Sequence, residues 1–117
     1  MSMRLALALL LALFVAFLGT PAIAADAQLT EDQTKGRALF NESCSFCHGE
    51  RGHATTLLGK RLGPDDAVLE RRANLNAELI RHVVRHGINS MPWYRRAELS
   101  DRDLESIIGY LTRTNSK

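Results

Sequence analysis

The sequence predicts an all-α domain of three to four helices, and two observations carry that prediction. Apolar residues recur at helical spacing in several segments, and a residue that commonly caps a helix N-terminus begins each of them. No segment shows a convincing strand pattern. Residues 25–117 are long enough for one domain with a thin core.

Residues 1–24 are typical of a signal peptide that is removed on export. Leu5–Leu18 is a 14-residue run without a charge, and Ala22-Ile23-Ala24 fits an A-x-A cleavage site. An uncleaved anchor is the alternative, but a membrane-spanning helix needs about 20 apolar residues. We expect cleavage after Ala24 or Ala25, no stable membrane insertion afterwards and, for a bacterial chain, a periplasmic mature domain.

The first helix of the mature chain is marked at its start by Thr30, with Gln33 at the third position of a capping box. Gly36, Phe40 and Cys44 follow at spacings of four and therefore share one face. A glycine inside a helix costs about 1 kcal/mol relative to alanine. Gly36 thus predicts that another helix crosses close by.

The segment Cys44-Ser45-Phe46-Cys47-His48 has the attachment signature of a c-type haem. Two thiols three positions apart lie on one side of a helical turn, where both can add to the vinyl groups of one porphyrin. His48 then offers a neutral imidazole nitrogen to the iron as proximal ligand. The motif predicts one covalent haem c with its iron, bound by Cys44, Cys47 and His48.

Three other uses of the two cysteines stay open. A thioredoxin-like dithiol shares the Cys-x-x-Cys spacing but belongs beside a strand–helix–strand pattern. A closed zinc site needs four ligands, usually from two separated pairs. A simple disulfide between Cys44 and Cys47 is also compatible with a secreted chain.

The glycine-containing stretch 49–63 loses helical periodicity, so we expect a loop along one edge of the haem. His53 in this loop is expected at the surface rather than on the iron, because a flexible loop positions a ligand poorly. Pro64 and the two acids after it predict the first turn of a short helix, with Val68 and Leu69 buried.

Asn76 predicts the N-cap of a further helix that runs to about His86 and stops at Gly87. The apolar stripe of this helix consists of Leu79, Ile80, Val83 and Val84. His82 and His86 share a different face, and we expect both to be exposed to solvent.

Met91 is the only methionine of the mature chain, and it follows His48 by 43 residues. It lies on a loop that Pro92 stiffens. A methionine thioether is a standard partner of histidine on haem iron, so we expect Met91 as the second axial ligand; core packing is the alternative. Trp93 and Tyr94 are expected to cover the haem edge.

The last helix begins at Ser100, with Asp103 at the capping-box position and Leu99 placed to contact Leu104 across the start of the helix. Its apolar positions at helical period are Leu104, Ile107, Ile108 and Leu111. Tyr110 adds an aromatic residue near the end of this segment.

The formal net charge is only +2, which gives little support to a nucleic-acid role. Residues 51–96 carry nine Lys/Arg against four Asp/Glu, whereas residues 26–50 carry two against five. The basic stretch is compatible with a docking face for an acidic partner. The alternative is a solvated surface in which Arg95 or Arg96 pairs with a haem propionate.

The haem motif and the later Ser90-Met91-Pro92, in this order and spacing, make nearly the whole mature region resemble a class I c-type cytochrome of the short bacterial kind. The resemblance implies a small cytochrome c fold in which the first and last helices cross near the haem. Gly36 and Phe40 match that contact on the first helix, and Ile107 and Tyr110 on the last.

The chain departs from this family in one respect. Many members place a proline shortly after the histidine, and the proline carbonyl holds the imidazole N–H. Here Pro64 lies 16 positions beyond His48, so we expect a backbone carbonyl near Thr55 or Thr56 to serve instead.

The resemblance implies a one-electron carrier rather than an enzyme, with iron held by His48 and Met91. Its redox partner proteins would be a periplasmic dehydrogenase as donor and an oxidase or another cytochrome as acceptor. Residues 75–111 also resemble the cytochrome subunits of flavoenzymes of the p-cresol methylhydroxylase type. Two alternatives remain: a haem with an open sixth position that binds a gas or peroxide, or a thiol–disulfide oxidoreductase that uses Cys44 and Cys47.

Overall fold

The computed structural model describes residues 28–115, and the predicted signal peptide therefore lies outside the described residues. Within that range the chain forms five α-helices and a short 3-10 helix and contains no strand, which confirms the predicted all-α class. The elements are α2 (Glu31–Ser43), α3 (Ser45–His48), α4 (His53–Leu62), α5 (Ala77–His86), α6 (Asp101–Leu111) and the 3-10 helix η1 (Thr112–Thr114). None of the described helices is long and apolar enough to cross a membrane.

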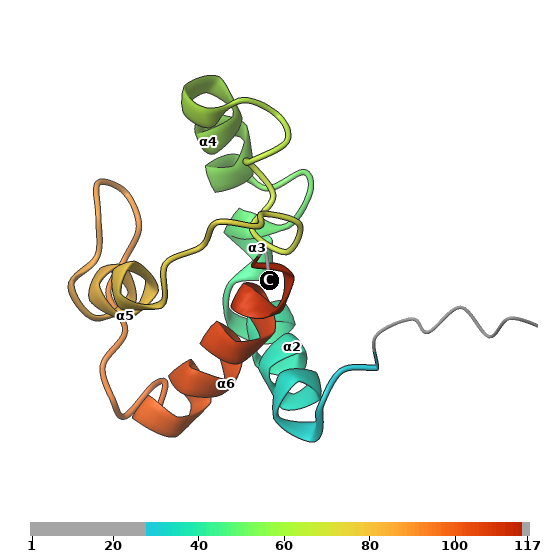
Figure 1. The fold of residues 1–117 in the computed structure, drawn as a ribbon. Coiled ribbons are helices and arrows are strands. Elements are labelled where there is room, and N and C mark those ends of the chain that lie inside the picture. The colour runs from blue at the N-terminus through green and yellow to red at the C-terminus, as the bar shows by residue number, and fades with distance from the viewer. Residues whose placement is uncertain (1–27, 116–117) are drawn as a thin grey trace, which may run out of the picture.

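The helices α2 and α6 cross in close contact and form the centre of the fold (Figure 1). A Cβ atom at Gly36 would lie 1.9 Å from the carbonyl oxygen of Ser106, so only a glycine allows the two backbones to approach this far. One turn further on, the rings of Phe40 and Tyr110 pack with their centroids 6.2 Å apart. The predicted helix crossing is confirmed, with Ser106 rather than Ile107 facing the glycine.

The structure confirms the N-caps predicted for α2, α5 and α6. The backbone N–H of Gln33 donates to the Thr30 hydroxyl over 3.2 Å, and the Gln33 side chain accepts from the Thr30 N–H in return. The Asn76 side chain accepts from the backbone of Leu79 over 2.9 Å at the start of α5. Ser100 caps α6 in the same way. Each side chain satisfies a backbone donor that the helix leaves unpaired.

The core contains the apolar positions predicted for α6 together with those of neighbouring elements. Its buried members are Phe40, Leu75, Ile80, Val84, Leu99, Leu104, Ile107, Ile108, Tyr110 and Leu111. On α5, Ile80 and Val84 are buried, whereas Leu79 is largely exposed. The predicted stripe of α5 therefore packs along only one of its edges.

The predicted loop at 49–63 is wrong, because most of this stretch forms α4. Two of its glycines are at the ends of the helix rather than inside it: Gly52 is the N-cap, and Gly63 stops the helix with a φ of 90°. Gly59 lies inside, where a Cβ would make only an ordinary 3.6 Å contact. His53 is exposed at the first position of α4, as expected.

The short helix predicted from Pro64 is also wrong, because the segment forms successive turns. The backbone N–H groups of Arg71 and Arg72 both donate to the carbonyl of Val68, each over 3.1 Å. So short a segment cannot recover the cost of nucleating a helix. Val68 is nevertheless buried as predicted, and Leu69 is half-buried.

The helices α4 and α5 pack outside the central pair α2 and α6. The helix α4 packs mainly on the short α3, while α5 packs on α6. In Figure 1, α4 stands away from the crossed pair α2 and α6. The residues that the sequence singles out for cofactor binding are on the segments that link the centre to these outer helices.

Candidate functional site

The cysteine–histidine motif forms one compact helical turn at the end of α2. Cys44 caps α2, and the backbone N–H groups of Cys47 and His48 both donate to its carbonyl, over 3.1 and 2.9 Å. Both thiols are free; Cys44 is half-buried and Cys47 is exposed. The local geometry is the single turn that the spacing predicted.

The His48 side chain is in a state suited to binding a metal. Its ring is half-buried, and burial lowers the pKa of the imidazole below its ordinary value, so the ring is neutral at neutral pH. The Nδ1 atom is buried and has no hydrogen-bond partner. A metal-bound histidine usually coordinates through one nitrogen and donates from the other.

The acceptor expected near Thr55 or Thr56 does not bond to His48 in this structure. The Thr55 hydroxyl oxygen is itself buried and unpaired, and it lies on α4, which packs on the helix that carries His48. Two unpaired buried polar atoms therefore occur on α3 and α4, which pack on each other. Buried polar atoms are rarely left unpaired in native proteins.

The Cys44 thiol lacks the properties of a redox-active dithiol. Burial, with a smaller effect from the nearby Cys47, raises the pKa of Cys44 to about 11. Reactive dithiols need a lowered thiol pKa, because the thiolate is the attacking species. Among residues 28–115 no three His, Cys, Asp or Glu side chains come together as a cation site, so the zinc interpretation finds no support there.

Met91 lies on a tight turn that backbone hydrogen bonds close. The backbones of Ile88 and Met91 form two hydrogen bonds, of 3.2 and 2.9 Å, and Asn89 between them has a φ of 51°. A Cβ at Gly87 would lie 2.8 Å from the Met91 carbonyl, so the turn needs glycine there. Met91 is half-buried and packs against the same core as Cys44.

The two aromatic residues that follow Pro92 differ in their surroundings. Trp93 is 58% exposed, whereas Tyr94 is half-buried and donates from its hydroxyl to the Ser43 carbonyl over 2.8 Å. Burial, and then the neighbouring Cys44 and Cys47 thiols, raise the pKa of Tyr94. The Tyr94 hydroxyl therefore remains a donor beside the two cysteines at neutral pH.

The two exposed arginines that follow Tyr94 already have acidic partners. Arg95 pairs with Glu98, and Arg96 pairs with Asp101 over 2.8 Å. His82 and His86 are both exposed as predicted, and their rings stack with centroids 4.4 Å apart. The local positive charge is therefore partly neutralised on the surface.

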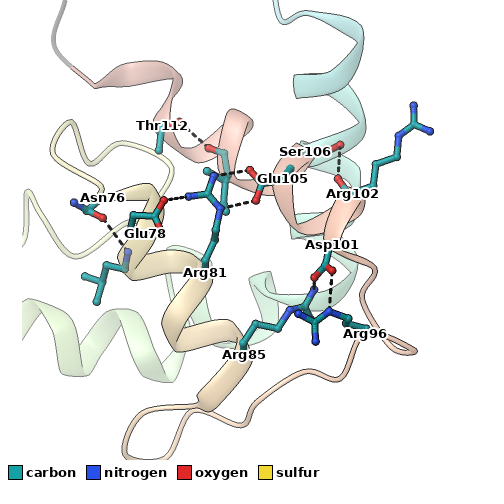
Figure 2. A network of polar contacts seen from close by, with 12 residues as sticks. Asn76, Glu78, Arg81, Arg85, Arg96, Asp101, Arg102, Glu105, Ser106 and Thr112 are labelled. Carbon is teal, nitrogen blue, oxygen red and sulfur yellow. Dashed lines mark hydrogen bonds and ion pairs between the residues drawn. The ribbon is translucent and has the colours of Figure 1, made fainter.

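Arg85 is a structural residue of the site that the sequence analysis missed. Its side chain is 13% exposed and donates to the carbonyls of Tyr94 and Leu99 and to Asp101, over 3.0, 2.9 and 2.8 Å. Figure 2 shows Arg85 and Arg96 meeting at Asp101, beside the Arg81–Glu105 pair. A basic residue in the last turn of a helix is the only sequence signal for it.

Large exposed apolar side chains lie on the motif, on α4, on α5 and on the segment after α5, rather than on the crossed helices at the centre of the fold. In the described residues they are Phe46, Leu57, Leu62, Leu79, Ile88 and Trp93, and none of them lies on α2 or α6. Phe46, between the two cysteines, is 93% exposed. A large apolar group attached at Cys44 and Cys47 would cover such surface, so the residues present fit a haem.

This fold and this site define the chain as a class I c-type cytochrome. Residues 31–111 match the family described as cytochrome c oxidase, cbb3-type, subunit III, and the chain belongs to that family. No curated protein and no solved structure matches the chain. Membership implies covalent haem c with its iron and electron transfer rather than enzymatic catalysis.

Proposed function

We propose that the protein is a periplasmic one-electron carrier whose haem iron is held by His48 and Met91. The observation that carries this proposal is the half-buried His48 imidazole with its buried, unpaired Nδ1, on the same turn as two free thiols. Met91 supports it, because its turn packs against the same core as Cys44. A haem bound here supplies one-electron exchange between ferric and ferrous iron.

Each residue of the site has a separate task. Cys44 and Cys47 attach the group covalently from one helical turn, and His48 donates a neutral nitrogen. Met91 would supply a soft sulfur from the turn after α5, and a Met/His ligand pair raises the reduction potential. Two protein ligands leave no position for a substrate, so the site favours electron transfer over bond chemistry.

The partners follow from chemistry and from the matched family. That family is described as a subunit of a cbb3-type cytochrome c oxidase, which supports an oxidase as the electron acceptor. A periplasmic dehydrogenase, including a flavoenzyme of the p-cresol methylhydroxylase type, is the proposed donor. Docking would be weak and salt-sensitive, as in other small redox interfaces.

Residues 1–24 are proposed to direct export and to be removed, which leaves residues 25–117 as the mature cytochrome. The test is the mass of the haem-loaded protein recovered from the periplasm after full-length expression. Cleavage after Ala24 or Ala25 gives two distinguishable masses. A full-length mass, or recovery only with membranes, would contradict the proposal.

The ligand assignment is tested by the absorption spectrum of the ferric holoprotein. We expect the weak far-red band of sulfur-to-iron charge transfer in the wild type and its loss in Met91→Ala. Met91→His is the matched control, because it keeps six ligands but removes the sulfur. Prompt carbon monoxide binding to the reduced wild type at neutral pH would instead indicate an open sixth position.

Covalent attachment is tested on a denaturing gel stained for haem. The wild type should retain its haem, whereas a Cys44→Ser, Cys47→Ser double variant should lose it in the denaturant. Cys47→Ser alone, which keeps one thiol, should retain a weaker stain. A colourless wild type from cells with an active haem-attachment system would contradict the cytochrome assignment.

A further inference from the structure

Tyr94 connects the segment that contains Met91, here called the Met91 segment, to two helices through hydrogen bonds. We propose that Tyr94 is a positioning residue: its hydroxyl ties the Met91 segment to the helix that ends in the haem motif, and so sets how readily Met91 leaves the iron. The inference rests on the proposed ligation by Met91 and adds a second residue to that site.

Three hydrogen bonds hold Tyr94, and they reach two different helices. Its backbone N–H donates to the Val84 carbonyl over 2.8 Å, and its own carbonyl accepts from Arg85 over 3.0 Å. Both of these partners are on α5. The third bond runs from the Tyr94 hydroxyl to the Ser43 carbonyl, over 2.8 Å. Ser43 is the last residue of α2 and directly precedes Cys44.

Because Tyr94 is close to Met91 in the sequence, this third bond limits how far Met91 can move. Only Pro92 and Trp93 separate the two residues, and the proline ring limits the freedom of that short connection. The other contacts of the Met91 turn are with residues just after α5: the backbone hydrogen bonds between Met91 and Ile88, and the close approach of Gly87 to the Met91 carbonyl. The Tyr94 hydroxyl therefore supplies the direct polar link between the Met91 segment and the end of α2.

The test measures opening of the Met91 segment in the folded ferric holoprotein. Imidazole at neutral pH binds the iron only when Met91 has dissociated, so its apparent affinity reports the open fraction. Loss of one net-stabilising hydrogen bond in Tyr94→Phe should raise that affinity, and the rate of imidazole binding, roughly five-fold. The haem should remain attached and the far-red band should remain at zero imidazole.

The other tyrosine of the chain gives a matched control. The Tyr110 hydroxyl hydrogen-bonds Glu70, and its ring packs on Phe40 in the centre of the fold, with no bond to the Met91 segment. Tyr110→Phe therefore removes a comparable hydroxyl from a contact between α6 and the turn segment that carries Glu70. We expect it to change the thermal midpoint while leaving the imidazole affinity within about two-fold of the wild type.

Each outcome has a separate meaning. Equal imidazole affinities for Tyr94→Phe and the wild type would overturn the inference, and so would an equal rise in Tyr110→Phe. Tyr94→Leu, which removes the ring as well, should open the segment further; an effect in the leucine variant alone would show that packing, not the hydroxyl, acts. A wild type without the far-red band would overturn ligation by Met91 itself, before any tyrosine variant is compared.

Discussion

The contact between α2 and α6 depends on the absence of one side chain. At Gly36 an added Cβ would lie 1.9 Å from the Ser106 carbonyl oxygen and 2.5 Å from its carbon. Real Cβ atoms essentially never come closer than 3.0 Å to such atoms, so Gly36→Ala requires the helices to separate by about 1 Å. The obstacle is backbone, and no change of rotamer can relieve it.

The expected cost follows from two opposing effects. Overpacking of this kind costs about 3 kcal/mol, at the upper end of its usual range because no side chain can move aside. Alanine regains about 1 kcal/mol through its higher helix propensity. The net loss in the free energy of unfolding is about 2 kcal/mol, which lowers the thermal midpoint of so small a domain by about 10 °C.

The measurement is thermal unfolding of the ferric holoprotein, followed by far-ultraviolet circular dichroism and by the Soret absorption. Gly109→Ala is the matched control, because it also changes a glycine inside a helix but has no atom within 4 Å of the added Cβ. That variant should gain about 1 kcal/mol. If Gly36→Ala is as stable as Gly109→Ala, the helices do not approach as described.

Further changes test the polar contacts around α5. Arg85→Gln should cost about 2 kcal/mol in chemical denaturation because it leaves two partly buried carbonyls unpaired. By contrast Arg96→Gln, whose side chain is 76% exposed, should change stability by less than about 0.5 kcal/mol. Asn76→Ala should cost about 1 kcal/mol through loss of the N-cap, and Asn76→Asp should not. Hydrogen bonding to Arg81 lowers the pKa of Glu105. The Arg81–Glu105 pair therefore contributes to the free energy of unfolding above the ordinary glutamate pKa of about 4.5, and this contribution is lost as the pH falls through the lowered pKa. Below pH 4.5 the free energy of unfolding should therefore fall less steeply with pH in Glu105→Gln than in the wild type. Equal slopes in the two proteins would contradict the pairing.

The parts of the fold that the sequence predicted are those governed by local chemistry. Caps at Thr30, Asn76 and Ser100 were predictable because each side chain bonds a backbone N–H only three residues away. The turn at residues 44–48 was predictable for the same reason, since the spacing of its cysteines is that of one helical turn. The Gly36 contact was inferred indirectly, from the cost of glycine within a helix.

The helix α4 could not be predicted because its apolar residues do not form a stripe against the core. Leu57 and Leu62 are largely exposed, and the helix packs mainly on α3. Hydrophobic periodicity reveals a helix only when one face is buried by protein. Glycines near both ends then made the segment look like a loop, although Gly52 and Gly63 are its caps.

Those same exposed residues show how the cofactor and the fold depend on each other. The crossed helices α2 and α6 bury their apolar faces against protein, but α4 and one edge of α5 leave leucines uncovered. A large apolar partner that covered these leucines would remove their apolar surface from water, which is favourable for a small domain with a thin core. Covalent attachment at Cys44 and Cys47 would hold that partner permanently on the protein. The haem is therefore proposed to complete the core beside α4 and α5, in addition to exchanging the electron.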